Sequence, residues 1–526
     1  MQFDFVAGAW ILVIAYAAVI LWLVTRGALK IKSMTDYAVG SVVFSPVAVG
    51  LSLAASMTSA ATFVINPGFI ANYGLSGLLA YGLFFPLASI GSLLILTKSF
   101  RKQGQQQKAL TLAQWIGKRY KSKSYGLFMA FLSLLLVTFI VLIVVAITKV
   151  LAKAMQVEEL YVLAGTIVFV FGYMMFGGAN SLVYTNMIQA SIMILVALVL
   201  LFSGFHFFSD GLDGFLLRLS EIDPMLVRAT NPESLLFRDF FEIGFAQFIV
   251  GVAVVVQPHI ITKSLLLKHE SDVNRYLVVA GLVQALFFSV VVTGLFARLT
   301  FPDLTFEGKA LTNDGIIPAY VVAVFSGGFV ATLVGLVVVL GLLSAGLSTL
   351  EGLIQSVSSS ITTDIVQALA GGRIEDKRLL VINKLAIAFL ALVAFWISRD
   401  QLVHPKLSVG ILAQNGVYAF FSSAFVPVLF GIYFKEPSWK VPFASSVAAF
   451  LIHFGIYYGL PFLHAHNALD LGFFTKFLEG EVRNPAIAAS LAILGSTLLG
   501  LMLLLVERVR VKTSDTNIQN SSNGNI

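Results

Sequence analysis

One short stretch of the chain combines small residues with hydroxyl side chains at helical spacing. Residues 343–352 read Leu-Ser-Ala-Gly-Leu-Ser-Thr-Leu-Glu-Gly, so that i, i+3, i+4 and i+7 are Ala345, Ser348, Thr349 and Gly352. On a helix these four share one face, which is small and oxygen-bearing. Sodium is a hard cation whose hydration shell hydroxyl and carbonyl oxygens can replace. The face could bind sodium, although Ser and Thr can also bond the carbonyl four residues back.

Two apolar segments are interrupted in a way that a simple membrane anchor is not. Residues 50–62 read Gly-Leu-Ser-Leu-Ala-Ala-Ser-Met-Thr-Ser-Ala-Ala-Thr before an Asn-Pro-Gly run at 66–68, and a later segment carries Gly251 and a Gln-Pro-His run at 257–259. Close helix packing is one interpretation of such small residues. At a helix break, however, backbone carbonyls become available to a cation, and a free helix N-terminus can hold a carboxylate. We therefore expect two broken helices.

The elements that position these residues are long apolar runs. Of the 526 residues, 58% are hydrophobic and 12% are charged, whereas soluble proteins carry about 25% charged residues. The runs are of the length that crosses a bilayer as helix, and they lack the alternation of a transmembrane β-barrel. The sequence predicts an all-α integral membrane protein with about 13 transmembrane helices. The runs centre near residues 17, 55, 84, 137, 168, 196, 250, 287, 340, 389, 420, 449 and 496.

The net charge of +7 indicates orientation rather than an anionic partner. With the N-terminus outside and the C-terminus in the cytoplasm, most Lys and Arg fall in cytoplasmic segments, as the positive-inside rule requires. The densest basic patch, between residues 98 and 123, then lies in a cytoplasmic loop and does not indicate nucleic-acid binding. We expect a multi-pass protein of the cell membrane whose surroundings are the lipid bilayer.

Several other chemistries are not indicated by the sequence. The chain has no Cys, and its seven His are scattered, with only His464 and His466 close together. No phosphate-binding loop of the Gly-x-x-x-x-Gly-Lys-Ser/Thr type is present. Apart from Glu351, the apolar segments offer no nucleophile beside a base. We therefore expect no enzyme, no organic cofactor and no obligate protein partner.

The apolar segments follow an ordered plan. The two interrupted segments each begin a set of five spans, which is typical of inverted repeats. An external loop between the repeats could form short surface helices or a lid. The expected divisions are an N-terminal span and cytoplasmic loop (1–44), a first repeat (45–208), the external loop (209–239), a second repeat (240–434), two C-terminal spans (435–511) and a disordered polar tail (512–526).

Five stretches in combination resemble the sodium:solute symporter family. Residues 341–364 contain the Ser-Thr pair, end in Ser-Ser-Ser-Ile-Thr-Thr-Asp and are similar to the family's signature segment. The other four stretches are residues 35–40, 54–68, 184–189 and 257–263. The resemblance implies the LeuT-type fold, a five-plus-five inverted repeat with one extra N-terminal and two extra C-terminal spans.

The resemblance also implies where a co-transported sodium ion binds. In this family the site consists of carbonyls of the first core helix with one carbonyl and two hydroxyls of the eighth. Carried onto this chain, the ligands are the carbonyls of Ala55, Thr58 and Ala345 and the side chains of Ser348 and Thr349. The helical spacing indicates the same hydroxyl pair.

The chain departs from the family at a second cation site. Where some members have a serine one turn beyond the Ser-Thr pair and an aspartate on the fifth core helix, this chain has Glu351 and Asn186. An ionisable side chain inside the membrane is costly and by default indicates function. With Ser348, Glu351 and Asn186 could form a relocated second cation site, or Glu351 could carry a proton. The alternative is a hydrogen-bonded glutamic acid that fills a gap in the packing.

Candidate solute-binding residues follow from the helices that the family uses, the first, second, sixth and tenth of the core. In this chain those helices offer Ser59, Thr62, Asn66, Tyr81, Gln247, Gln257, Gln414 and Asn415. Gln and Asn can instead hold neighbouring helices together. Residues 247–256 are mostly aliphatic, which argues against the proline-carrying branch, while 222–224 and 301–304 look more like the pantothenate and monocarboxylate branches.

The resulting expectation is a sodium-coupled secondary symporter that imports a small organic solute by alternating access. A carboxylate, either a monocarboxylate or a pantothenate-like molecule, is the leading candidate. A symporter of the same family for amino acids or sugars is the alternative within transport. A channel or a transporter-like membrane sensor is the alternative from another class.

Overall fold

The described part of the chain is almost entirely helical. The computed structural model describes residues 4–523 except 268, 326, 405–408, 435–437, 467–468, 479 and 481, and side chains are not described for 105 and 509–523. Short π- and 3-10-helical segments are labelled η. The N-terminal half contains α1 Phe5–Ala28, α2 Met34–Val39, α3 Pro46–Met57, η1 Ala61–Ile65, α4 Asn66–Tyr73, α5 Leu75–Leu78, η2 Leu79–Phe84, α6 Phe85–Gln107, α7 Leu112–Arg119, α8 Lys123–Ser133, η3 Leu134–Leu136, α9 Val137–Met155, α10 Glu159–Met174 and α11 Ala179–Ser203.

The second half repeats this helical character after a segment of short helices. It contains η4 Phe205–Phe208, α12 Gly211–Ile222, η5 Pro224–Val227, η6 Phe241–Ala246, α13 Gln247–Val254, α14 Pro258–Ile261, η7 Thr262–Leu266, α15 Asp272–Ser289, η8 Val290–Val292, α16 Thr293–Thr300, η9 Asn313–Gly315, α17 Ile316–Phe325, α18 Phe329–Ser359, η10 Ser360–Val366, α19 Gln367–Leu369, α20 Asp376–Val403, α21 Val409–Tyr433, α22 Lys440–Phe454, η11 Gly455–Gly459, α23 Leu460–Ala465, η12 Gly472–Phe474, α24 Thr475–Leu478 and α25 Pro485–Asn523. A short antiparallel hairpin pairs β1 Thr305–Phe306 with β2 Lys309–Ala310.

The helices have the length and composition of membrane spans. Among the described residues, 10 helices are long and apolar enough to cross a membrane, or up to 12 if each of two bent pairs is one span. The remaining expected span, near residue 168, corresponds to α10, which has 16 residues, fewer than the roughly 20 that cross the hydrocarbon core. The count of 13 therefore stays a prediction, while the all-helical membrane architecture is confirmed.

Both expected helix breaks are present. Pro46–Met57 and Ala61–Tyr73 are bent by 53°, and Phe241–Val254 and Pro258–Leu266 by 56°. The second break arises because Pro258 has no N–H and holds the preceding residue in an extended conformation. At the first break, the Ser59 hydroxyl accepts a hydrogen bond from the Ala61 N–H at 3.1 Å and so caps the second half-helix.

Gly251 has a different place from the one expected. It lies within α13, and a Cβ added there would meet the Phe85 carbonyl oxygen at 2.7 Å and the Ala88 Cβ at 2.8 Å. Gly251 therefore allows α13 to pack closely on α6, and the break itself comes later, at the Gln-Pro pair. Close approach through small residues is a usual way of joining helices in a membrane.

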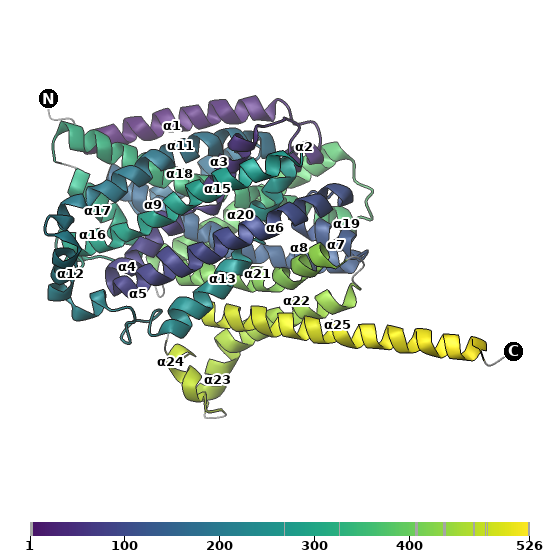
Figure 1. The fold of residues 1–526 in the computed structure, drawn as a ribbon. Helices are drawn as coiled ribbons and strands as arrows, with labels where there is room; N and C mark the ends of the chain where they lie inside the picture. The colour runs from purple at the N-terminus through teal and green to yellow at the C-terminus, as the bar shows by residue number, and fades with distance from the viewer. Residues whose placement is uncertain are drawn as a thin grey trace.

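Helix α18 occupies the middle of the bundle and packs against α3, α9 and α11. Its glycines permit this, because a Cβ at Gly341 would lie 2.4 Å from Val196 of α11 and a Cβ at Gly346 would lie 2.5 Å from Ile147 of α9. The first helix, α1, lies on the opposite side of the bundle from the C-terminal pair α22 and α25 (Figure 1). The broken helix α3–α4 and α18 are thus brought together inside the protein.

Of two segments outside the repeats, one agrees with the expectation and the other does not. The segment 209–239 forms the short helices α12 and η5, as expected. Helix α25 instead runs to Asn523, so the backbone of residues 512–523 is helical where a disordered tail is expected. An established helix adds each further hydrogen bond without a new nucleation cost, which is why a polar continuation can extend an apolar span. Residues 524–526 lie outside the described part.

Replacing Gly74 is expected to destabilise the fold. Gly74 joins α4 to α5 with a φ of +66°, and an added Cβ would lie 2.0 Å from the Leu226 carbonyl oxygen in η5. We expect Gly74→Ala to cost roughly 3 kcal/mol, from backbone strain and overpacking together. The thermal unfolding midpoint of purified protein in detergent measures this loss. Gly91→Ala in α6 is the control, since nothing lies within 4 Å of its added Cβ, and equal midpoints for the two variants would contradict the prediction.

Candidate functional site

The oxygen-bearing face of α18 lies against the first helix break. The Ser348 Oγ lies 2.8 Å from the Ala55 carbonyl oxygen and 3.1 Å from that of Ala345. The Thr349 Oγ1 donates to the Ser56 carbonyl oxygen at 3.0 Å. All five residues are buried. Both hydroxyls therefore reach across to α3, and that of Ser348 also bonds a carbonyl of its own helix.

Thr58 is placed differently from the other expected sodium ligands. It ends α3 with an extended backbone (φ −105°, ψ 100°), so its carbonyl points away from the helical direction. Its hydroxyl accepts a hydrogen bond from Gln284 Nε2 at 2.8 Å. Ser56, which was not among the expected ligands, brings the second α3 carbonyl beside the Ser-Thr pair. Its position between Ala55 and the break is the sequence signal that could have indicated it.

The donor set at this point suits a monovalent cation. It consists of neutral carbonyl and hydroxyl oxygens that are buried between α3 and α18. Divalent ions are usually held by carboxylates, and the described residues include no group of three or more His, Cys, Asp or Glu that could hold a metal ion. Neutral oxygens in a dry site can replace the hydration shell of sodium.

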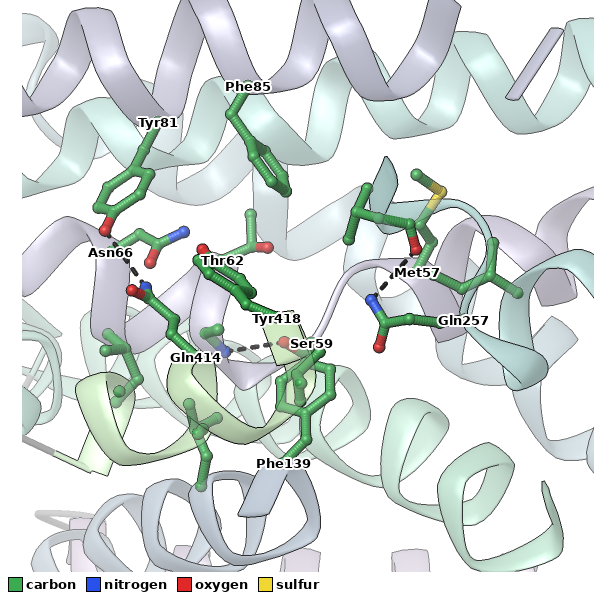
Figure 2. Close-up of a pocket in the computed structure, with 18 of the residues that line it drawn as sticks. Met57, Ser59, Thr62, Asn66, Tyr81, Phe85, Phe139, Gln257, Gln414 and Tyr418 are labelled. Atoms are coloured by element: carbon green, nitrogen blue, oxygen red, sulfur yellow. Dashed lines mark hydrogen bonds between the residues drawn. The ribbon is translucent and has the colours of Figure 1, made fainter. Parts of the chain in front are cut away.

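A cavity of about 90 Å³ lies between the two helix breaks. Six of the eight residues expected to bind solute line it, namely Ser59, Thr62, Asn66, Tyr81, Gln257 and Gln414. Figure 2 shows Asn66, Tyr81 and Gln414 grouped on one side and Gln257 on the other. The residues come from both broken helices and from η2 and α21, so the cavity sits where the two halves of the chain meet.

Only some of the polar groups of the cavity form hydrogen bonds within the protein. Gln414 Nε2 donates to the Tyr81 hydroxyl at 3.3 Å. Gln257 Nε2 donates to the Val254 carbonyl oxygen at 3.2 Å, while its buried Oε1 has no hydrogen-bond partner among the described residues. A buried acceptor without a partner costs roughly 1–3 kcal/mol. Gln257 Oε1 is therefore an unsatisfied acceptor on a residue of the cavity wall.

Two of the expected solute residues do not line this cavity. Asn415 donates from Nδ2 to the Tyr458 hydroxyl at 2.7 Å, and its Oδ1 lies 2.9 Å from His453 Nε2. Gln247 is buried in α13 outside the cavity lining. Neighbouring residues on a helix point in directions about 100° apart, so Gln414 and Asn415 cannot both face the same space.

The apolar walls of the cavity were not among the expected residues. They include Phe85, Phe139 and Tyr418, which surround the polar groups (Figure 2). Tyr418 lies four residues after Gln414 on α21, and this spacing is the signal that could have indicated it. Mostly apolar walls with a few polar groups are typical of small-molecule sites.

The Glu351 carboxylate is held by three hydrogen-bond donors. Tyr173 OH donates to Oε1 at 2.5 Å, Thr185 Oγ1 donates to Oε2 at 2.6 Å and Gln189 Nε2 donates to Oε1 at 3.3 Å. Glu351 is 1% exposed. Three donors suit an ionised carboxylate, which is an acceptor only. Glu351 is therefore part of a hydrogen-bonded polar cluster, an arrangement that a cation site, a proton carrier and a hydrogen-bonded packing role all share.

Asn186 faces α3. Its Nδ2 donates to Ser56 Oγ at 2.8 Å and to Ser52 Oγ at 3.3 Å. Ser56 Oγ in turn donates to the Ser348 carbonyl oxygen at 3.2 Å. Ser56 thus connects Asn186 with Ser348, two of the three residues expected at the second cation site.

Known proteins with similar sequences are sodium-coupled transporters. The chain is 25% identical over 438 residues to the sodium/pantothenate symporter of Escherichia coli, covering 80% of this chain and 84% of that protein. It is 27% identical over 294 residues to the sodium/pantothenate symporter of Haemophilus influenzae, covering 55% and 58%. It is also 26% identical over 289 residues to sodium/proline symporter 2 of Staphylococcus saprophyticus, covering 53% and 52%.

A solved structure shows the same fold. A Na⁺-coupled sialic acid symporter, in a substrate-bound outward-open state, superposes with a TM-score of 0.70 at 15% identity, covering 94% of this chain and 96% of that one. The expected LeuT-type fold is therefore confirmed. Residues 37–445, which include both broken helices and α18, match the family described as Sodium:solute symporter family. Its members are membrane transporters coupled to sodium, not enzymes. The chain belongs to the sodium:solute symporter family.

Proposed function

We propose that the protein imports a small carboxylate that also carries a hydroxyl or an amide N–H, together with sodium. The observation that carries this proposal is the cavity between the two breaks, which offers hydrogen-bond donors and the unpartnered acceptor Gln257 Oε1. Two relatives are named as pantothenate symporters. Pantothenate combines a carboxylate with hydroxyls and an amide, and it is the leading candidate.

The charge of the cavity lining favours an anionic solute over a cationic one. Among the described residues that line it, none is Asp or Glu, so no carboxylate is available to pair with an ammonium group. The second half of the first broken helix begins beside Ser59, and its N-terminal end carries a partial positive charge. A helix end of this polarity favours a carboxylate nearby. Ser59, Thr62 and Asn66 would add side-chain donors.

The sodium ion would act by joining α3 to α18. Sodium bound to the Ala55 and Ala345 carbonyls and to the Ser348 and Thr349 hydroxyls would hold these helices together. We infer that sodium binds first and stabilises an outward-open arrangement, and that the solute then closes the cavity before inward release. In this cycle the repeats at residues 45–208 and 240–434 move against each other, with the N-terminus outside.

A thermal-shift screen of the purified protein tests the proposal. The compounds are pantothenate, small monocarboxylates, proline and other amino acids, and sugars, each in sodium chloride and in potassium chloride. A true ligand stabilises the folded protein by mass action. We expect pantothenate or another substituted carboxylate to raise the midpoint most, and only with sodium. A sodium-dependent shift with proline or a sugar, and none with carboxylates, would overturn the proposal.

Gln257 is expected to set solute affinity. We expect Gln257→Leu to raise the KM for uptake of radioactive pantothenate into proteoliposomes about tenfold, because one hydrogen bond contributes roughly 0.5–1.5 kcal/mol and about 1.4 kcal/mol is a factor of ten. Gln247→Leu is the matched control, since Gln247 is equally buried but lies outside the cavity lining. An increase in KM for Gln247→Leu and none for Gln257→Leu would show that the solute binds elsewhere.

A further inference from the structure

Lys263 places its amino group inside the protein, beside the first helix break. It lies in η7, just after the second break, and its side chain is 7% exposed. Its Nζ donates to the Ser52 carbonyl oxygen at 2.8 Å, to Ser52 Oγ at 2.8 Å and to Ser56 Oγ at 2.5 Å. All three N–H groups of the ammonium therefore have an oxygen acceptor.

These three oxygens form the kind of shell that binds a small monovalent cation. They comprise one carbonyl and two hydroxyls, as at the neighbouring sodium site. Ser56 Oγ accepts from Lys263 and Asn186 and donates to the Ser348 carbonyl oxygen, which uses its full hydrogen-bonding capacity. The ammonium fits this shell without leaving either serine hydroxyl unsatisfied.

The opposite charge is also present. Glu351 is buried, and its Oε2 accepts a hydrogen bond from Thr185, the neighbour of Asn186, whose Nδ2 reaches the same two serine hydroxyls as the Lys263 ammonium. The hydrogen bonds described for the carboxylate come from neutral groups, which leave its negative charge uncompensated. A buried charge is costly unless an opposite charge is near. Lys263 thus supplies the compensating cation for a carboxylate at the position expected to serve a second ion.

We propose that the Lys263 ammonium is a tethered cation that permanently fills the second cation position, so that one sodium ion binds per chain. The inference rests on the proposed sodium site at Ser348 and Thr349, because it concerns a second ion beside that one. The lysine supplies the positive charge that a second sodium ion would supply, and it is not transported. Glu351 is then the fixed counter-charge of Lys263 and carries no proton in the cycle.

Counting bound sodium tests this inference without requiring any solute. Equilibrium binding of radioactive sodium to the purified full-length protein, at ionic strength kept constant with choline chloride, is expected to saturate at one ion per chain. That ion should disappear in Ser348→Ala/Thr349→Ala. Two sodium ions bound to the wild type would overturn this inference but not the sodium site at Ser348 and Thr349. No bound ion would overturn the sodium site and the inference with it, whereas failure of pantothenate uptake would affect only the solute assignment.

A pair of variants separates charge compensation from a merely structural lysine. Lys263→Met removes the ammonium and leaves the Glu351 charge beside the Ser52 and Ser56 oxygens, so we expect a second sodium to bind. Lys263→Met/Glu351→Gln removes both charges and should again bind one. A single ion in a folded Lys263→Met protein would overturn the inference. If that variant does not fold, the number of sodium ions bound per wild-type chain still tests the inference.

Discussion

Replacing Ser348 and Thr349 together with alanine is expected to abolish sodium-stimulated uptake while the protein stays folded in the membrane. The two hydroxyls reach across from α18 to the Ala55 and Ser56 carbonyls. A contact between a polar group and a charge contributes roughly 1.5–3 kcal/mol, so loss of two should weaken sodium binding by at least about a hundredfold. Initial uptake rates in proteoliposomes, measured against sodium concentration, give the change directly.

A matched control keeps this result specific. Ser490 and Ser496 are also fully buried, but each bonds a carbonyl of its own helix α25. Ser490→Ala/Ser496→Ala likewise removes two buried hydroxyls and should keep the sodium dependence of the wild type. If both double variants retain sodium-stimulated uptake, the ion binds somewhere other than between α3 and α18.

Glu351→Gln is expected to destabilise the protein strongly in sodium-free buffer. If Glu351 is the counter-charge of Lys263, as proposed above, the change leaves the buried ammonium without a compensating negative charge. Loss of one partner from a buried charge pair costs roughly 3–5 kcal/mol. The thermal unfolding midpoint should fall by several degrees. Glu307→Gln is the control, because the Glu307 side chain is 66% exposed in its pair with Lys153 and an exposed pair contributes about 1 kcal/mol or less.

The double variant Glu351→Gln/Lys263→Met distinguishes a charge effect from a packing effect. Removing both charges should recover most of the stability that Glu351→Gln loses, because no unpaired charge remains. If the two losses simply add, Glu351 and Lys263 act independently, and the destabilisation comes from the lost hydrogen bonds of the carboxylate.

Much of the fold could be predicted because it follows from local chemistry. Apolar runs without charge must be helical inside a bilayer, and Pro258 cannot continue a helix because it lacks an N–H. The proposed sodium site could also be located in the sequence, since Ser348 and Thr349 are adjacent on one helix face. Ser59, Thr62 and Asn66 lie at i, i+3 and i+7, a spacing that predicts one face on a regular helix, although Ser59 lies in the break and Ala61–Ile65 is π-helical.

The remaining features depend on contacts between distant parts of the chain. Lys263 bonds Ser52, a residue 211 positions away, and nothing in its local sequence shows that its side chain points into the protein rather than toward the surface. Gln247 precedes Gln257 across a break, so helical spacing could not relate their directions. The length of α25 beyond the apolar span was likewise not indicated by its polar composition.

The tethered ammonium of Lys263 has an electrical consequence for the whole cycle. A monoanionic solute that crosses with a single sodium ion moves no net charge, because the lysine stays in the protein and is balanced by Glu351. The membrane voltage, which contributes about 2.3 kcal/mol per charge at 100 mV, would then neither drive nor oppose uptake. Accumulation would follow the sodium gradient alone, about tenfold for a tenfold gradient. Such a carrier runs in either direction, and the cell could release the same solute whenever its internal concentration exceeds that limit.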